Sequence, residues 1–468
     1  MKNIEYYNKN NWDKSTLLKN AKEKNGEYNI FVTLLDELKH TESNSPLNNV
    51  PYTLKDNFST NNILSTASSN SLLDYNPVYD STVYKKLTDA GCVLVGKTVL
   101  DELAMGGKGI TANSGVVKNS LNKSLISGGS SAGSAVSVSL SLVPFSIGSD
   151  TGDSIRKPAA YNAIVGYKPT YGLISRYGLF PFASSLDHVG VLTNNVLDAA
   201  KVVNEIKGKD EKDMTSINSS DIDLVSEIEK ESKNNKLFYI KELVDINNYN
   251  NPSKYLKDML EEFNKKIHLL KQQGYVIKEE SIDINILNAI PACYSVIAFA
   301  EATSNYSNLN GIVFGPREKG NTYEDIMKNA RSKGFCSLIK RRFVIGSYAL
   351  DKENQEKYFL NAKRVRNLIV TKMDSYFEKY DALIMPVGNG YIEKIDEDYK
   401  IENDLEKALD DNLVIGNFGG YPSITIPVSF VNDFPFAVNL TSKRKDDKNL
   451  LNLTYNIEKL MDFKRGEE

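Results

Sequence analysis

The chain has 468 residues, enough for one large α/β domain or for two to three smaller domains. Its 41% hydrophobic and 25% charged residues are ordinary for a soluble globular protein. Because 57 basic and 60 acidic residues leave a formal net charge of −3, the sequence does not indicate a protein that binds nucleic acid through its own charge.

The cysteines and the N-terminus indicate the compartment. Cys92, Cys293 and Cys336 are far apart and have no CxxC spacing, which argues against disulfides and a zinc site and suits a reducing cytosol. The start, MKNIEYYNKNNW, has no apolar signal-peptide core, and no stretch approaches the roughly 18 uninterrupted apolar residues of a membrane span. We therefore expect a cytoplasmic protein without a membrane contact.

The N-terminal part alternates helical and strand patterns. Apolar residues at helical spacing, at positions 17, 18 and 21 and again at 31, 34, 35 and 38, predict helices within the first forty residues. Residues 50–58, VPYTLKDNF, predict a strand, and residues 81–90 predict a helix that Gly91 closes. The following CVLVG predicts a short buried strand. This alternation favours an α/β architecture with a largely parallel sheet.

The alternation continues in the second half of the chain. Helices are expected at 197–206, 256–270, 289–305 and 358–373, and strands at 275–282 and 382–387. Residues 207–236 are polar and lysine-rich, which predicts a surface excursion, and the acidic residues 390–412 predict a long loop.

Residues 127–158, SGGSSAGSAVSVSLSLVPFSIGSDTGDSIRKP, carry most of the information about function. Their two Gly/Ser clusters, 127–134 and 148–154, bracket seven large apolar residues that favour burial, so the segment is not a flexible linker. Glycine lets backbone N–H groups point at a ligand, and serines beside such groups indicate acyl chemistry.

Residues 91–98, GCVLVGKT, match the phosphate-binding pattern GxxxxGK[ST]. That loop needs a strand before its first glycine and a turn-forming interior, whereas here a helix precedes it and CVLV is itself the expected strand. We interpret the match as a coincidence and Lys97 as an ordinary residue at a strand end, and we expect no ATP binding by this chain alone.

A reactive serine needs a base. The chain contains three histidines: His40, His188 and His268. GSSAG at residues 129–133 fits the GxSxG elbow of α/β-hydrolases, with Ser131 as nucleophile and His268 as base. The elbow should follow a strand, but residues 121–126 form only a weak strand pattern. A lysine can serve instead if burial lowers its pKa from about 10.4 towards neutrality, and Lys55 at the end of an apolar strand pattern is the candidate.

The segments GGSSAGSA and GSDTGDSIR, with the lysine of PYTLKDNF, resemble the signature of the amidase signature family. The resemblance implies an α/β fold with one large, twisted, mixed and mostly parallel sheet that helices cover on both faces. It also implies a Ser-cisSer-Lys triad. By the match, Ser154 is the nucleophile, Ser130 in a cis peptide relays the proton, and Lys55 is the base.

The same resemblance places the backbone N–H groups of Thr151, Gly152 and Asp153 in an oxyanion hole. The family reads GSDTGGSIR, so Asp153 stands where a second glycine is expected. The side chain leaves the N–H donor in place, but a carboxylate near a developing oxyanion is repulsive. We expect Asp153 to weaken catalysis without abolishing the fold.

Further segments, among them GKTVLDELAMG, EATSNYSNLNGIVFG and NFGGYPSITIPV, resemble one branch of the family, the A subunits of glutamyl-tRNA(Gln) amidotransferases. This implies a single domain over residues 1–468, with core motifs at 49–190 and 289–428 and a helical and polar excursion at about 195–288. Proteins of that branch hydrolyse L-glutamine for B and C partner subunits in a heterotrimer. ATP, Mg²⁺ and Glu-tRNA(Gln) are then expected mainly at the partners, with no cofactor or metal in this chain.

Carried over by position, Arg342 would hold the α-carboxylate of glutamine, Asp410 its α-amine, and Tyr294 would line the pocket. A guanidinium grips a carboxylate bidentately and an acid pairs with an ammonium, so these residue types suit the roles. The neighbouring Asp411 is an alternative to Asp410. Two rival functions stay open: a free-standing amidase with the same triad, and a scaffold subunit whose catalysis Asp153 has weakened.

Overall fold

The structure is a computed structural model that describes residues 2–232 and 235–465. Its strands are β1 (Phe31–Leu34), β2 (Pro51–Lys55), β3 (Val93–Thr98), β4 (Phe145–Asp150), β5 (Val165–Lys168), β6 (His188–Thr193), β7 (Lys236–Ile240), β8 (Val276–Glu280), β9 (Ala382–Pro386), β10 (Ser423–Val431) and β11 (Phe434–Thr441). Together they form one 11-stranded sheet in the order β1-β3-β2-β4-β6-β5-β10-β11-β9-β7-β8.

The predicted α/β fold with a mixed sheet is confirmed, but the expectation that most strand pairs are parallel is wrong. Of the ten neighbouring pairs among the described residues, six are antiparallel and four are parallel. The parallel pairs lie in the groups β3-β2-β4 and β9-β7-β8, and the strands between these groups run antiparallel. Strand and helix patterns along a chain do not fix strand direction, because hairpins such as β10-β11 return the chain without a crossover helix.

The helices are α1 (Ile4–Lys9), α2 (Lys14–Tyr28), α3 (Thr82–Asp89), α4 (Ala132–Ser139), α5 (Arg156–Tyr161), α6 (Val196–Ile206), α7 (Lys241–Val244), α8 (Lys254–Gln272), α9 (Ile284–Asn288), α10 (Ile290–Asn305), α11 (Tyr323–Gly334), α12 (Ser337–Leu350), α13 (Asn361–Phe377), α14 (Asp404–Asp410), α15 (Val414–Phe418) and α16 (Asp447–Met461). Short 3₁₀ or π turns occur at Asn70–Leu72, Glu102–Ala104, Ile246–Asn248 and Glu356–Leu360.

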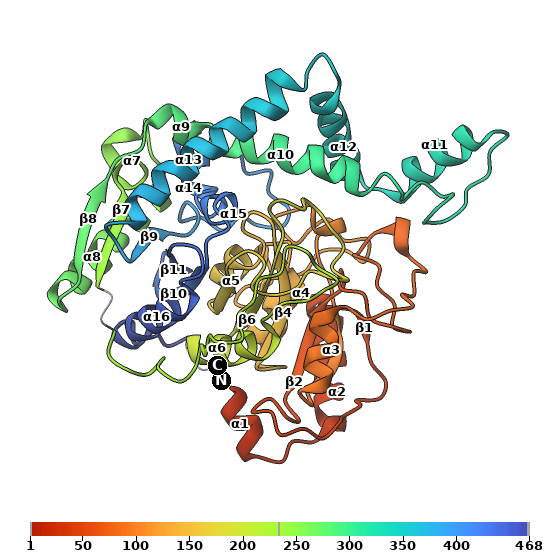
Figure 1. The fold of residues 1–468 in the computed structure, drawn as a ribbon, viewed down its shortest axis with the longest axis horizontal. Helices are drawn as coiled ribbons and strands as arrows, with labels where there is room; N and C mark the ends of the chain where they lie inside the picture. Colours follow the sequence, from red (N-terminus) through yellow and green to blue (C-terminus); the bar gives the residue numbers. More distant parts are fainter. Residues whose placement is uncertain (1, 233–234, 466–468) are drawn as a thin grey trace.

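Helices cover both faces of the sheet, as predicted. Successive side chains of a strand point to opposite faces, and in β3 Val93 and Val95 join the apolar cluster of α2 and α4 whereas Leu94 joins the cluster of α3, α6 and α16. Figure 1 shows α10, α12 and α13 lying together at one side of the molecule and α11 projecting away from the rest.

Most predicted elements are present, and two expectations are wrong. Residues 31–34, expected to be helical, form β1, which pairs antiparallel with the edge of β3. Residues 390–412, expected to be a loop, contain α14, whose Leu405 and Leu409 are buried. In both places a short apolar pattern is compatible with either structure, and its tertiary neighbours decide.

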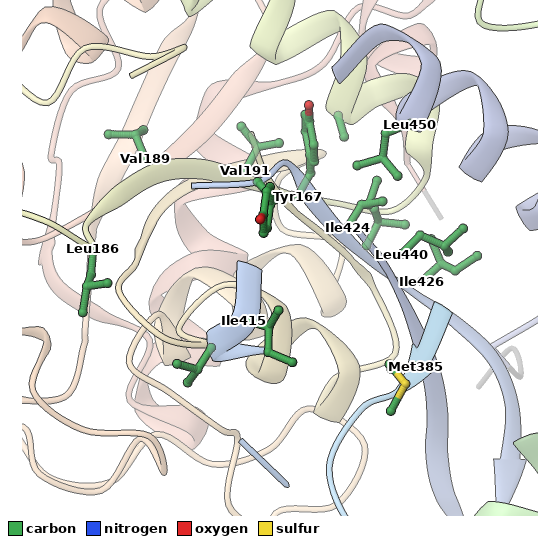
Figure 2. Packing of buried hydrophobic residues seen from close by; sticks show 14 of the residues in the cluster. Tyr167, Leu186, Val189, Val191, Met385, Ile415, Ile424, Ile426, Leu440 and Leu450 are labelled. Carbon is green, nitrogen blue, oxygen red and sulfur yellow. The ribbon is translucent and has the colours of Figure 1, made fainter. Parts of the chain in front are cut away.

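The core near the centre of the sheet joins strands that are distant in the sequence. Tyr167 of β5, Ile424 of β10 and Leu440 of β11 are fully buried, and Figure 2 shows them close to Leu450 of α16. Because β5 pairs with β10 across more than 250 residues of chain, this cluster ties the two parts of the sheet together.

Residues 284–305, which comprise α9 and α10, form a helical segment long and apolar enough to cross a membrane by length and composition alone. Of its most apolar window, 44% is buried inside the protein. Helix α10 packs against α12 and α13, so many of its apolar side chains already have protein partners.

We expect Leu440→Ala to lower the free energy of unfolding by about 2–5 kcal/mol, because it removes a fully buried side chain and leaves a cavity between the strands. Urea denaturation measures the change. Leu368→Ala is the matched control, since that leucine is 54% exposed, and its effect should stay within about 0.5 kcal/mol. Equal effects of the two substitutions would contradict the described packing.

Candidate functional site

The turn from β4 to α5, residues 150–156, carries most of the second Gly/Ser cluster. Arg156, at the end of this turn, contacts both Asp150 and Gly152. The fully buried guanidinium pairs with Asp150, with 2.9 Å between Nη2 and Oδ1, and also donates to the carbonyl of Gly152 at 2.7 Å. It further donates to the carbonyl of Leu413 and to the side-chain oxygen of Asn417. Burial would raise the pKa of Asp150, but the charge and hydrogen bonds of Arg156 hold it well below its usual value. The ionised Arg156–Asp150 pair therefore fixes the position of the turn.

Lys55, the last residue of β2, is fully buried and points at the first Gly/Ser cluster. Its Nζ donates to Ser130 Oγ at 2.7 Å, to Ser149 Oγ at 2.9 Å and to the Ser149 carbonyl at 3.2 Å. Burial lowers the pKa of Lys55 to about 7, although nearby carboxylates, Asp101 first, act in the opposite direction. Half of the Lys55 amines are then neutral near physiological pH, which is the state that a base requires.

A backbone hydrogen bond brings the loop of Ser130 next to Ser154. The Gly129–Ser130 peptide bond is cis, and the N–H of Ser131 donates to the Ser154 carbonyl at 3.1 Å. Ser154 is 3% exposed, and in the described part of the chain its Oγ makes no hydrogen bond. Catalytic hydrogen bonds are often long before substrate binds, so this arrangement leaves the hydroxyl available to a reacting group.

Thr151, Gly152 and Asp153 form the middle of the same turn. Gly152 packs against Tyr294 of α10, and a Cβ at this position would lie 2.8 Å from the phenol ring. The Thr151 hydroxyl donates to Asp187 at 2.7 Å. These contacts fix the backbone of the turn, and the lack of a side chain at Gly152 makes the close approach of Tyr294 possible.

Asp153 faces a cation. Its carboxylate lies 3.8 Å from Nζ of Lys157, one helical turn further along α5. Burial raises the pKa of Asp153 to about 6; the charge of Lys157 opposes this rise, and Asp150 and Asp410 add to it. At neutral pH the carboxylate is therefore mostly ionised beside the turn that holds Ser154, and Lys157 partly neutralises it.

Asp153 lines a cavity of about 470 Å³, and so do the residues predicted to bind substrate. Tyr294, Arg342, Asp410 and Asp411 all lie on its wall, so the structure brings the sequence-predicted pocket residues into one space. The Arg342 guanidinium stacks on Phe299 at 4.8 Å and, among the described residues, pairs with no carboxylate. It is therefore available to bind an anionic group of a ligand.

Asp410 and Asp411 both line the cavity but have different partners. Asp410 accepts a hydrogen bond from Lys157 Nζ at 2.7 Å. Burial, followed by the charge of Asp410, raises the pKa of Asp411 to about 7. The two neighbouring carboxylates thus differ, one in an ion pair and the other partly protonated at neutral pH.

Sequence reasoning missed several residues that hold the site. Asp101 accepts hydrogen bonds from the N–H groups of Gly109, Ile110 and Thr111 and donates its own N–H to the Ser130 carbonyl. Ser149 was also missed, although it lies inside the second Gly/Ser cluster. Acidic and hydroxyl residues that act on distant loops leave no spacing pattern in the chain that could reveal them.

Lys97 is not the ordinary strand-end residue that was predicted. It is fully buried in β3, forms an ion pair with Asp56 at 3.4 Å and donates to the Phe58 carbonyl at 2.8 Å. The interpretation of GCVLVGKT as a coincidental match is supported, because α3 precedes the first glycine and the interior is β3. Lys97 therefore stabilises the loop after β2, where Lys55 ends the strand.

The hydrolase elbow lacks its structural context. Residues 121–126 form isolated bridges instead of a strand, and α4 begins directly after Ser131. His268 lies exposed on α8, where its ring contacts Gln272. The Ser131 hydroxyl donates to the Ser149 carbonyl, so it has a structural partner.

Comparison with known proteins finds matches along nearly the whole chain. The Amidase family model matches residues 19–451. The chain is 38% identical over 437 residues to the A subunit of glutamyl-tRNA(Gln) amidotransferase from Mycoplasma pneumoniae, covering 91% of this chain and 88% of that protein. The identity is also 38% to the corresponding protein of Staphylococcus aureus, covering 95% and 88%.

Solved structures agree. The crystal structure of the A subunit of glutamyl-tRNA(Gln) amidotransferase from Thermotoga maritima is similar with a TM-score of 0.79 and 32% identity, covering 95% of this chain and 90% of that chain. A peptide amidase from Stenotrophomonas maltophilia has the same fold, with a TM-score of 0.73 and 24% identity, covering 90% and 84%.

We expect amide hydrolysis to depend on the neutral form of Lys55. Because the amine is protonated below its pKa, kcat/KM should fall as the pH drops through about 7 and level off above it. Lys55→Arg keeps a permanent charge and should lose about 10²- to 10⁴-fold in rate. A rate profile whose midpoint stays near the ordinary lysine value, about 10.4, would contradict the role of burial.

Asp153→Gly should raise kcat for amide hydrolysis about tenfold. The gain is smaller than the 10²- to 10³-fold effect of a lost oxyanion donor, because the N–H of residue 153 is present in both proteins. Asp153→Asn is the matched variant that removes the charge and keeps the side chain, so it separates repulsion from backbone geometry. Unchanged turnover in both variants, measured with the expected partner subunits present, would show that the carboxylate is harmless.

Proposed function

The chain belongs to the amidase family, and we propose that it is the glutamine-hydrolysing subunit of a glutamyl-tRNA(Gln) amidotransferase. The observation that carries the proposal is the buried hydrogen bond between Lys55 and Ser130, next to the turn of Ser154, in a chain 38% identical to curated A subunits over most of its length. A lysine that burial makes partly neutral at physiological pH is a base for serine chemistry.

In the proposed mechanism Ser154 attacks the side-chain amide carbon of glutamine. Its proton passes to Ser130, whose own proton passes to the neutral amine of Lys55. The new C–O bond turns the amide oxygen into an oxyanion, which faces the N–H groups of residues 151–153. The oxyanion collapses, the C–N bond breaks, and the leaving nitrogen takes the proton back through Ser130 as ammonia. Water then releases glutamate from Ser154 by the same proton path.

In this proposal glutamine binds in the cavity beside this turn. Arg342 supplies a guanidinium that has no carboxylate partner among the described residues, which suits the α-carboxylate of glutamine. Tyr294 lines the pocket and packs on Gly152. Asp410, or alternatively its neighbour Asp411, is the carboxylate proposed for the α-amine, and both line the cavity.

We place the chain in a multi-subunit enzyme, because its curated relatives are named as subunits of one. The B and C subunits of a heterotrimer are the proposed partners, in the cytoplasm. ATP and Mg²⁺ would be bound by a partner that phosphorylates and amidates Glu-tRNA(Gln) with the released ammonia. The rival functions are a free-standing amidase and a scaffold protein with weakened catalysis.

Ser154→Ala in the chain co-purified with its partner subunits tests the proposal. Removal of the nucleophile should lower glutamine-dependent ammonia release about a thousandfold or more. Ser131→Ala is the matched control, since Ser131 is a buried neighbour with a structural hydrogen bond, and it should retain activity within about tenfold.

Each rival predicts a different result. Loss of activity only in Ser131→Ala would support the hydrolase elbow. Full turnover by the isolated chain would favour a free-standing amidase. No ammonia release from the natural sequence, with ATP-dependent amidation still driven by added ammonium, would mean that the chain is a scaffold.

A further inference from the structure

Lys157 projects from the first turn of α5 into the proposed substrate cavity. Its side chain is only 10% exposed, and its ammonium lies 2.7 Å from Asp410 and 3.8 Å from Asp153. Asp410 is the residue to which the α-ammonium of glutamine was assigned. The carboxylate assigned to that ammonium is therefore already bound to a cation of the protein itself.

We infer that Lys157 is a specificity-determining residue that acts as a resident ammonium in the amine subsite. The inference rests on the proposed function and concerns the same cavity. Lys157 donates to Oδ2 of Asp410, so an incoming α-ammonium must either displace Lys157 or share the carboxylate with it, close to a second positive charge. In either case the α-ammonium contributes little to the binding of substrate.

The charges around the cavity support this inference. Burial alone would lower the pKa of Lys157, but the charges of Asp410, Asp153 and Asp411 outweigh it and raise that pKa well above its usual value. The other lysines on the cavity wall have partners of their own: Lys108 pairs with Glu393, and Lys407 pairs with Asp404. Lys157 is thus the lysine of the cavity wall that contacts Asp410, the carboxylate proposed for the α-ammonium.

Arg342, on the wall of the same cavity, differs from these lysines. Arg342 has no carboxylate partner in the part of the chain that the structure describes, so a substrate carboxylate meets an available cation there. These charges favour a short ω-amide that carries a carboxylate, with or without an α-ammonium. We therefore expect the protein to accept 4-carbamoylbutanoate, which is glutamine without its α-amine, about as well as L-glutamine.

The experiment compares these two ligands in the assembled complex. Dissociation constants are measured by calorimetry in a Ser154→Ala background, and kcat and KM are measured with Ser154 intact. In the natural sequence the two ligands should bind within about threefold of each other. Lys157→Gln should lower the dissociation constant of L-glutamine about 10- to 100-fold relative to that of 4-carbamoylbutanoate, because Asp410 then pairs with the α-ammonium. The effect should appear in KM more than in kcat.

Three further variants make the result specific. Lys157→Arg keeps a cation at the subsite and should preserve the weak discrimination. Lys157→Gln combined with Asp153→Gly removes both members of the 3.8 Å pair and should discriminate as Lys157→Gln does. Lys108→Gln removes a lysine from the wall of the same cavity and should change the affinity for both ligands by a similar factor.

The inference is overturned if the natural sequence binds L-glutamine more than tenfold better than 4-carbamoylbutanoate, a result that needs no variant to fold. It is also overturned if Lys157→Gln leaves the ratio of the two dissociation constants unchanged. If Lys157→Gln creates the preference for L-glutamine but neither ligand is hydrolysed, the role of Lys157 stands and the proposed function is contradicted. If glutamine is hydrolysed but Lys157→Gln leaves that ratio unchanged, the proposed function stands and the role of Lys157 is contradicted.

Discussion

The buried ion pair between Arg156 and Asp150 is the interaction on which the site depends. Both side chains are fully buried, where an unpaired charge would cost several kcal/mol, so each hydrogen bond of the guanidinium matters. Through Leu413 and Asn417, Arg156 ties the turn of Ser154 to a part of the chain more than 250 residues away. The position of the turn thus depends on the completed sheet.

Three buried lysines show how partners decide the chemistry of one residue type. Lys97 is paired with Asp56, and Lys157 is paired with Asp410. Lys55 instead contacts neutral hydroxyl and carbonyl groups, so burial brings its pKa to about 7. Desolvation of an ammonium without a contacting carboxylate yields a base, whereas the same ammonium beside a carboxylate yields an ion pair.

Much of the fold and of the candidate site could be predicted because local patterns carry it. The strand of VPYTLKDNF, the helix after Ser81 and the apolar helix from residue 290 follow from periodicity and punctuation. The family resemblance of the Gly/Ser motifs and of PYTLKDNF led to Lys55, Ser130 and Ser154, and the structure places Lys55 against Ser130 and Ser130 next to the turn of Ser154. Strand β1 carries an apolar pattern that also suits a helix, and its pairing with β3 is a tertiary contact that four residues cannot reveal.

The sequence by itself determined the α/β class, the amidase-type motifs and the departure at Asp153, since these depend on residue types at short spacing. Only the tertiary structure decided the strand directions, the network of Arg156 and the contact of Lys157 with Asp410. The physical reason is that each of these depends on groups brought together over long stretches of chain. Burial, charge and distance among such groups exist only once the sheet has formed.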